Sequence, residues 1–335
     1  FVAYGLGLVA LRLAPVRPGI VLGLGAAVQL LPLLAPTLLS TDVHVYEDYG
    51  RRAVFDGQNP YVEKENNPVP SVYGPLFTLV SELASLVVRD EGSTEFALRV
   101  VAAGSVVAAS VLAGRLAGDR ALAVAFVAWN PLLALHFAGG GHNDGLMVAA
   151  VLSALLLARS GRRHLAGVAW AASIFVKWVS AALLPLLFAE SGKRGRRPGL
   201  AALAAASLAL AIVATQRYGD EWARAGFGLA RTGTRTGSIG AAHWLEQLGV
   251  AGRARELAVE VAQIAALVAL AWRAHVSGKA RLGLAACLLA ILQGWLNPWY
   301  AVWGVGLAAA DAGDRWGRTL AVLLSGYLLL DVTTW

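Results

Sequence analysis

Long apolar runs separated by short charged turns make up most of the chain, and they predict membrane-spanning helices. Ile20–Leu39 is the first clear span, and blocks such as Leu200–Ala214 and Leu257–Trp272 are rich in Ala and Leu. Such runs are long enough to cross the hydrocarbon core of a bilayer as helices. We expect an all-α polytopic membrane protein with about ten to twelve transmembrane helices. No linker marks a second domain, so residues 1–335 are expected to form one domain.

The longest polar interval is Thr41–Pro75, which directly follows the first span. We expect external loops at about 40–95, 139–145 and 216–255. The arginines before Ile20 place that end of the first span in the cytoplasm by the positive-inside rule, and Asp42 then lies outside.

The apolar segment Val72–Val88 decides the rest of the topology. If it crossed the membrane, the basic turn Arg159–His164 would be external, against the positive-inside rule. If it lies at the interface as an amphipathic helix, the basic turns are cytoplasmic and the Gly139–Gly145 turn faces outward. We choose the interfacial helix.

Leu165–Phe188 has basic turns on both sides. A single span would place one of the two turns outside, against the positive-inside rule, whereas a hairpin of two short half-helices meeting near Lys177 and Trp178 keeps both turns in the cytoplasm. Non-helical backbone at membrane depth is tolerated where it lines a protected cavity.

The composition excludes a soluble protein, and it shows how the net positive charge should be interpreted. Hydrophobic residues make up 57% of the chain, and the net charge is +7. Because most Lys and Arg lie in turns between spans, the charge sets topology, and we expect no nucleic-acid partner. The single cysteine, Cys287, excludes a disulfide framework and a thiolate metal site.

The first external loop offers two candidate bases and two candidate substrate ligands. Asp42 lies one turn past a span, where a carboxylate is partly shielded and still reaches water, which suits a group that takes a proton from a hydroxyl. A helix cap is the alternative. Asp48 is the second candidate, although its neighbours also fit an ion-paired amphipathic helix. His44 and Tyr46 are candidates for substrate binding, and His44 alternatively is only solvated.

The GGGHNDG turn supplies the second group of candidates, His142, Asn143 and Asp144. Three glycines let the backbone approach a ligand closely, and ionisable groups near membrane depth usually mark function. A cap on the following helix is the alternative. His142 and Asp144, together with Asp42 and His44, are also candidates for binding a divalent cation such as Mg²⁺ or Mn²⁺, but their spacing assigns no metal ligand.

Five later residues are candidates for binding the substrate. Lys177 lies in an apolar segment and needs an anionic partner such as a phosphate, unless it extends to the headgroups. Arg231 and Arg235 depart from the positive-inside rule, which favours phosphate binding. Trp299 and Tyr300 belong either to an aromatic belt or to a surface that stacks against a sugar ring.

A series of short motifs follows the first span in a fixed order. TDxxVY comes directly after that span. The later motifs are Gly57–Tyr61, Tyr73–Leu76, Asn130–Met147, Phe175–Phe188 and Leu296–Tyr300. In this order they resemble the GT-C superfamily of integral-membrane glycosyltransferases, specifically the polyprenyl-phosphate-mannose-dependent type of actinobacteria and archaea.

The resemblance implies a GT-C-like bundle in the plasma membrane and a role in cell-envelope glycan biosynthesis. It implies inverting transfer of a sugar, preferably mannose, from a polyprenyl-phosphate donor to a hydroxyl of a glycolipid or glycan acceptor at the external face. Asp42 matches the family's general base. The second acidic loop maps to His142–Asp144, and the hairpin lysine maps to Lys177. A transporter or flippase of lipid-linked sugars is the alternative.

Overall fold

The computed structural model describes residues 1–37, 39–63, 69–190, 197–232 and 239–331, and its described elements are all helical. The first nine α-helices are α1 (Val2–Leu13), α2 (Pro18–Leu30), α3 (Asp42–Phe55), α4 (Pro75–Val88), α5 (Glu91–Leu116), α6 (Arg120–Ala128), α7 (Pro131–Phe137), α8 (Asp144–Arg159) and α9 (Arg163–Val176). The later ones are α10 (Leu184–Ala189), α11 (Leu200–Tyr218), α12 (Glu221–Thr232), α13 (Ala241–Gln247), α14 (Gly252–Ser277), α15 (Leu282–Ile291), α16 (Ala301–Ala310) and α17 (Arg315–Asp331). Short 3₁₀ helices are η1 (Leu31–Leu34), η2 (Trp178–Leu183) and η3 (Pro298–Tyr300).

The model confirms an all-α fold with apolar helices of membrane-spanning length. By length and composition, three described helices (α5, α11 and α14) can each cross a membrane, and the bent pair α6–α7 adds a fourth. The remaining apolar helices of the described residues are shorter, with 10 to 17 residues, and the number of ten to twelve transmembrane helices stays a prediction. Proline explains several interruptions, because Pro131 and Pro298 each begin a new helical segment and Pro32 is the second residue of η1.

The predicted hairpin around Lys177 is confirmed. Helix α9 ends at Val176, and Lys177 has an extended backbone that starts the return through η2 and α10. After α10 the chain lies beside the start of α9, where Gly199 N–H donates to the Arg163 carbonyl at 2.7 Å. Lys177 therefore lies at the tip of two half-helices.

The basic turns gather at the end of the bundle opposite this tip. Arg159, Arg163 and Lys279 line one cavity of about 670 Å³ there, together with Gly118 and Asp311. The 139–143 turn lies at the other end of α8, sixteen helical residues away from Arg159. The predicted topology requires the basic turns and the glycine turn to lie at opposite ends of the bundle, and the structure has them there.

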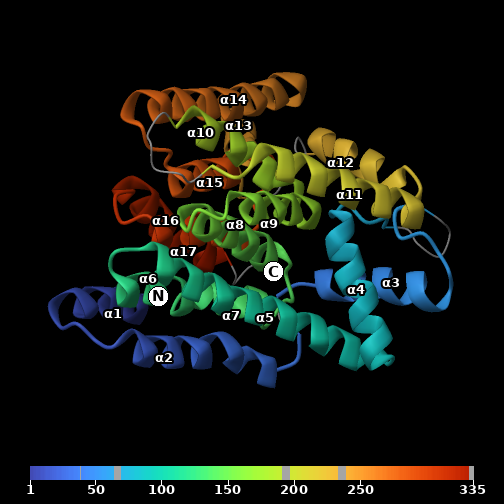
Figure 1. Ribbon diagram of the computed structural model, residues 1–335, viewed down its shortest axis with the longest axis horizontal. Helices are drawn as coiled ribbons and strands as arrows, with labels where there is room; N and C mark the ends of the chain where they lie inside the picture. The colour runs from blue at the N-terminus through green and yellow to red at the C-terminus, as the bar shows by residue number, and fades with distance from the viewer. Residues whose placement is uncertain (38, 64–68, 191–196, 233–238, 332–335) are drawn as a thin grey trace.

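The polar interval after the first span contains the helix α3 and ends at the first residue of α4. Helix α3 buries Val43 and Tyr46 and packs against α4, where Gly50 allows the close approach of the Ser81 backbone. In Figure 1, α4 runs across the direction of α5. Helix α4 has 14 residues and lies within the segment Val72–Val88, and its position at the membrane interface stays a prediction. The loop predicted at 216–255 likewise contains two helices, α12 and α13.

Candidate active site

Asp42 is the first residue of α3 and remains partly accessible, with 33% of its side chain exposed. Tyr46, one turn later on the same helix, donates its hydroxyl to Asp42 Oδ2 at 3.3 Å. The Tyr46 hydroxyl also lies 3.0 Å from the hydroxyl of Tyr73. Burial raises the pKa of Asp42 above its ordinary value, and the Lys177 charge and the Tyr46 hydroxyl offset part of this rise.

The glycine turn brings a second group of side chains to Asp42. Gly141 has a positive φ of 72°, and a Cβ there would lie 2.7 Å from a methyl of Val43, the neighbour of Asp42. A Cβ on Gly140 would lie 3.1 Å from Nε2 of His142. Glycine at both positions therefore lets the turn approach the start of α3 and makes room for the imidazole.

His142 lies between Asp42 and the aromatic residues of η3. Its Nδ1 is 3.5 Å from Asp42 Oδ2, and its ring stacks on Trp299 at a centroid distance of 3.6 Å. Burial, followed by the nearby charges of His136 and Lys177, lowers the pKa of His142 well below its ordinary value. The imidazole is therefore neutral at physiological pH.

Asp144 and Lys177 form a buried ion pair at the tip of the hairpin. Lys177 Nζ lies 2.8 Å from both carboxylate oxygens of Asp144, and the Trp303 indole N–H donates to Oδ1 at 2.5 Å. Asp144 is fully buried, and its partners neutralise and orient the carboxylate. The alternative of a side-chain cap is not supported for Asn143, which stands at the N-cap of α8 without a capping hydrogen bond.

Three aromatic rings surround the ammonium of Lys177. The Nζ atom lies 5.5 Å from the ring centre of Tyr73, 4.9 Å from that of Tyr300 and 5.7 Å from that of Trp303. Such cation–π contacts stabilise a desolvated cation by about 2 kcal/mol. The ammonium is thus held in place close to Asp42 and Asp144 by charge and by ring faces.

Arg99 of α5 fixes the glycine turn to the end of the first apolar segment. Its Nε donates to the Ala138 carbonyl at 2.7 Å, and its Nη2 donates to the carbonyls of Pro32 and Ala35 at 2.8 Å. Charge-assisted bonds of this kind are stronger than neutral ones. The chain segments before Asp42 and before His142 are therefore tied to one side chain.

Most of the candidate residues lie in this cluster, but some do not. Asp48 points elsewhere and pairs with Arg52 at 2.7 Å, while His44 lies 3.5 Å from Glu95. The side chain of Arg231 and all of Arg235 lie outside the described residues. The candidates that the structure gathers around Asp42 are Tyr46, His142, Asn143, Asp144, Lys177, Trp299 and Tyr300.

Three further residues of the cluster were not identified from the sequence. Tyr73 contacts both Tyr46 and Lys177, Trp303 contacts Asp144, and His136 lies with its ring centre 5.9 Å from that of His142. The spacing of Trp299 and Trp303, four residues apart at the start of a helix, is a signal that could have identified Trp303.

The side chains of the cluster do not fit a divalent cation. No group of three or more His, Cys, Asp or Glu side chains in the described part of the chain could hold a metal ion. Both oxygens of Asp144 already contact Lys177, whereas Mg²⁺ requires several free oxygen ligands. The cation predicted for Asp42, His44, His142 and Asp144 stays a prediction, and we derive no step through it.

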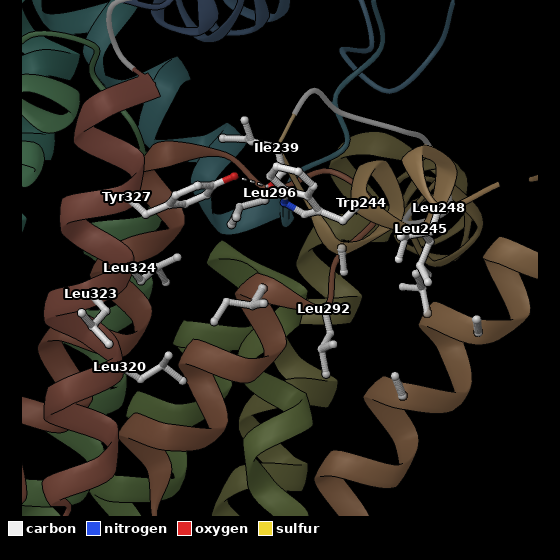
Figure 2. Close-up of a pocket in the computed structure, with 15 residues that line it drawn as sticks. Ile239, Trp244, Leu245, Leu248, Leu292, Leu296, Leu320, Leu323, Leu324 and Tyr327 are labelled. Atoms are coloured by element: carbon white, nitrogen blue, oxygen red, sulfur yellow. Dashed lines mark hydrogen bonds between the residues drawn. The ribbon is translucent and has the colours of Figure 1, made fainter. Parts of the chain in front are cut away.

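An apolar groove begins next to the cluster and lies among α13, α14, α15 and α17. It encloses about 600 Å³, and Figure 2 shows leucine side chains of α17 pointing into it. The Tyr327 hydroxyl at its edge donates to the Ile239 carbonyl at 3.4 Å. Leu296 lines the groove and immediately precedes the Asn297–Tyr300 segment of the cluster.

Two family models match successive parts of the chain. Residues 25–190 match the model described as alpha-(1->6)-mannopyranosyltransferase, N-terminal domain. Residues 232–334 match the model described as MptB C-terminal domain. The first match contains Asp42, the glycine turn and Lys177, and the second contains Trp299, Tyr300 and Trp303.

Curated relatives agree with these models. The chain is 29% identical over 240 residues to alpha-(1->6)-mannopyranosyltransferase A of Mycobacterium tuberculosis. This alignment covers 63% of this chain and 46% of the relative. It is 30% identical over 180 residues to the protein of the same name from Corynebacterium glutamicum, covering 48% of this chain and 36% of the relative. The matches thus span less than half the length of these relatives. No solved structure matches the chain.

Proposed function

We propose that this chain, which belongs to the alpha-(1->6)-mannopyranosyltransferase family, transfers a mannosyl group from a polyprenyl-phosphate donor to a hydroxyl of a glycolipid or glycan acceptor. The observation that carries the proposal is the cluster itself: a partly exposed carboxylate, Asp42, lies beside a fixed ammonium, Lys177. Transfer of a sugar from a phosphate to a hydroxyl is assisted by a base that takes the hydroxyl proton and by a cation that stabilises the leaving phosphate.

Asp42 acts as the base in this proposal. Its carboxylate takes the proton of the acceptor hydroxyl while the oxygen attacks the anomeric carbon, and the bond from that carbon to the phosphate oxygen breaks. Attack on the face opposite the leaving phosphate inverts the anomeric carbon, as in inverting glycosyl transfer generally. The partial exposure of Asp42 supports this role, because the acceptor must reach it.

Lys177 stabilises the leaving phosphate. The departing group gains negative charge and needs electrostatic stabilisation more than a proton. The Asp144 ion pair and the rings of Tyr300 and Trp303 hold the ammonium in place before substrate binds, so little reorganisation is required during the reaction.

The apolar groove supports a lipid-linked donor. Its lining from α13, α14, α15 and α17 offers a hydrocarbon chain almost no polar partner. Because Leu296 joins the groove to the η3 segment, a chain lying there would end close to Trp299 and Tyr300. The phosphate of such a lipid would then lie near Lys177.

The basic turns support an external location for the reaction. Arg159, Arg163 and Lys279 gather at the end of the bundle opposite Lys177. The positive-inside rule assigns that end to the cytoplasm, so the reaction takes place at the external face of the plasma membrane.

A reconstituted transfer assay tests this function. The purified protein in liposomes, supplied with radiolabelled mannosyl polyprenyl phosphate and a mannoside acceptor, is expected to form labelled product with inverted configuration. EDTA is expected to leave the rate unchanged, since Lys177 occupies both oxygens of Asp144. Label that crosses the bilayer without forming product would instead identify a flippase.

A further inference from the structure

The imidazole of His142 is enclosed on all sides beside Asp42. It has no exposed surface, and one ring face is covered by Trp299. Within the described residues neither of its ring nitrogens has a hydrogen-bond partner, and Nδ1 lies 3.5 Å from Asp42 Oδ2. Leaving a buried polar group unpaired costs about 1–3 kcal/mol, so an imidazole at this position needs a partner.

The enclosure argues against direct contact between His142 and the substrate. The sequence alone favours substrate binding by this residue, but a ligand reaches neither the covered ring face nor a side chain with no exposed surface. The side chain of Asp42, by contrast, is 33% exposed. The contact available to His142 Nδ1 is the carboxylate of Asp42.

We propose that His142 is a positioning residue whose Nδ1–H donates to the carboxylate of Asp42 and fixes the orientation in which Asp42 accepts a proton. The proposal rests on the proposed function, in which Asp42 is the base. A separation of 3.5 Å is long for a hydrogen bond, and contacts of this kind shorten when substrate binds and water leaves. The same logic applies to the buried partner that orients the base of a catalytic triad.

Other groups also influence the protonation of Asp42, and all belong to elements packed around it. They are Tyr46, Tyr49 and Tyr73 of the first loop, Asp144 of α8, Lys177 of the hairpin tip and Tyr300 of η3. An N–H that donates to the carboxylate favours its charged form and so lowers the pKa of Asp42. Loss of the His142 N–H is therefore expected to raise that pKa further.

Two substitutions separate positioning from packing. His142→Phe keeps a ring that can stack on Trp299 and removes both nitrogens. His142→Asn removes the ring and keeps an amide N–H near the position of Nδ1. If the ring serves only to pack against Trp299, the phenylalanine variant resembles the wild type and the asparagine variant is impaired. If His142 positions Asp42, the asparagine variant resembles the wild type and the phenylalanine variant is impaired.

The first measurement is the pH profile of mannosyl transfer by both variants. Partners that orient a functional side chain typically contribute about 10- to 100-fold. His142→Phe is expected to lower kcat by about that factor, to leave KM within about twofold, and to move the acid limb of kcat/KM to higher pH. His142→Asn is expected to retain the wild-type acid limb and a kcat at least about tenfold above that of His142→Phe.

The second measurement needs no activity and separates this proposal from the function. A ¹³C NMR titration of aspartate-labelled protein, with Asp42→Asn to assign the signal, reports the pKa of Asp42 directly. A raised pKa in His142→Phe and a wild-type value in His142→Asn support positioning. An unchanged pKa in His142→Phe would overturn it, even if the protein transfers mannose. Absence of transfer with the expected titration would instead count against the proposed function.

Discussion

The Tyr46 hydroxyl lies on the same face of α3 as Asp42 and influences the pKa of its carboxyl group. It donates to Asp42 Oδ2 at 3.3 Å and thereby lowers the pKa of that carboxyl, while burial raises it. The two effects on the pKa oppose each other. Removing the hydroxyl therefore lets burial raise the pKa of Asp42 further.

Tyr46→Phe is therefore expected to raise the pKa of Asp42 and to move the acid limb of the kcat/KM profile to higher pH. Activity falls most at acidic pH, where more Asp42 is protonated, and recovers as the pH rises past the new pKa. A pH series of transfer rates measures this shift. A limb that stays in place or moves to lower pH would contradict the role of the hydroxyl.

Helical periodicity separates the two acidic candidates of the first loop. Asp42 and Asp48 are six residues apart on one helix, which places them on different faces. Asp48 accordingly pairs with Arg52 at 2.7 Å, with 42% of its side chain exposed. The sequence did not settle this choice, because it does not show at which residue of Thr41–Pro75 a helix begins and therefore which side chains share a face.

The crossing of α3 over α4 depends on the absence of a side chain at Gly50. A Cβ there would lie 2.2 Å from the Ser81 carbonyl oxygen, an atom of the α4 backbone that cannot rotate away. A methyl group at this position must push the two helices apart. Since α3 begins with Asp42, such a movement also disturbs the cluster.

Gly50→Ala is expected to destabilise the protein by about 1–3 kcal/mol or more, as overpacking of a tight contact does. Thermal unfolding in detergent measures the change. Gly104→Ala in α5 is the matched control, because nothing lies within 4 Å of its added Cβ. That variant is expected to be neutral or stabilised by up to about 1 kcal/mol through better helix propensity. Equal effects of the two variants would contradict the close crossing.

The hairpin could be predicted from the sequence, whereas the ion pair at its tip could not. Basic turns on both sides of Leu165–Phe188 required a return to the same end of the bundle, and the structure has it. The partner of Lys177 is Asp144, 33 residues earlier, and Asp144 also meets Trp303, 159 residues later. Contacts at such separations depend on how helices pack, and one sequence does not reveal their register.

Across the whole molecule, the two ends of the bundle could be predicted from the sequence, whereas the lengths of the helices could not. Charge placement separates the basic turns from Lys177, and the structure has them at opposite ends. The count of about ten to twelve membrane helices came from apolar runs between charged turns, and it stays a prediction. Pro131 divides the apolar run at 120–137 into a bent helix pair, and hydrophobicity alone does not show where a run is divided.

The groove gives a prediction that concerns several helices together. Ala262 of α14 lines the groove, and Ala265 lies exposed on the same helix outside it. Ala262→Trp fills part of the 600 Å³ and is expected to raise the KM for a ten-isoprene mannosyl donor by about tenfold, equivalent to about 1.4 kcal/mol. A two-isoprene donor, too short to occupy the groove, is expected to be unaffected.

Ala265→Trp is the control and is expected to change neither KM. Kinetics with both donors measure the difference between the variants. Equal effects of Ala262→Trp on the long and the short donor would contradict a lipid chain in the groove, while leaving the chemistry at Asp42 untouched.

The most direct measurement is the rate of mannosyl transfer by Asp42→Asn, with Asp48→Asn as the matched loss of a carboxylate from the same helix. If Asp42 is the base, its replacement lowers kcat by about 100- to 10,000-fold. Asp48→Asn breaks only a partly exposed pair with Arg52 and stays within about twofold of the wild type. Undiminished transfer by Asp42→Asn, or an equal loss in both variants, would contradict the assignment of Asp42 as the base.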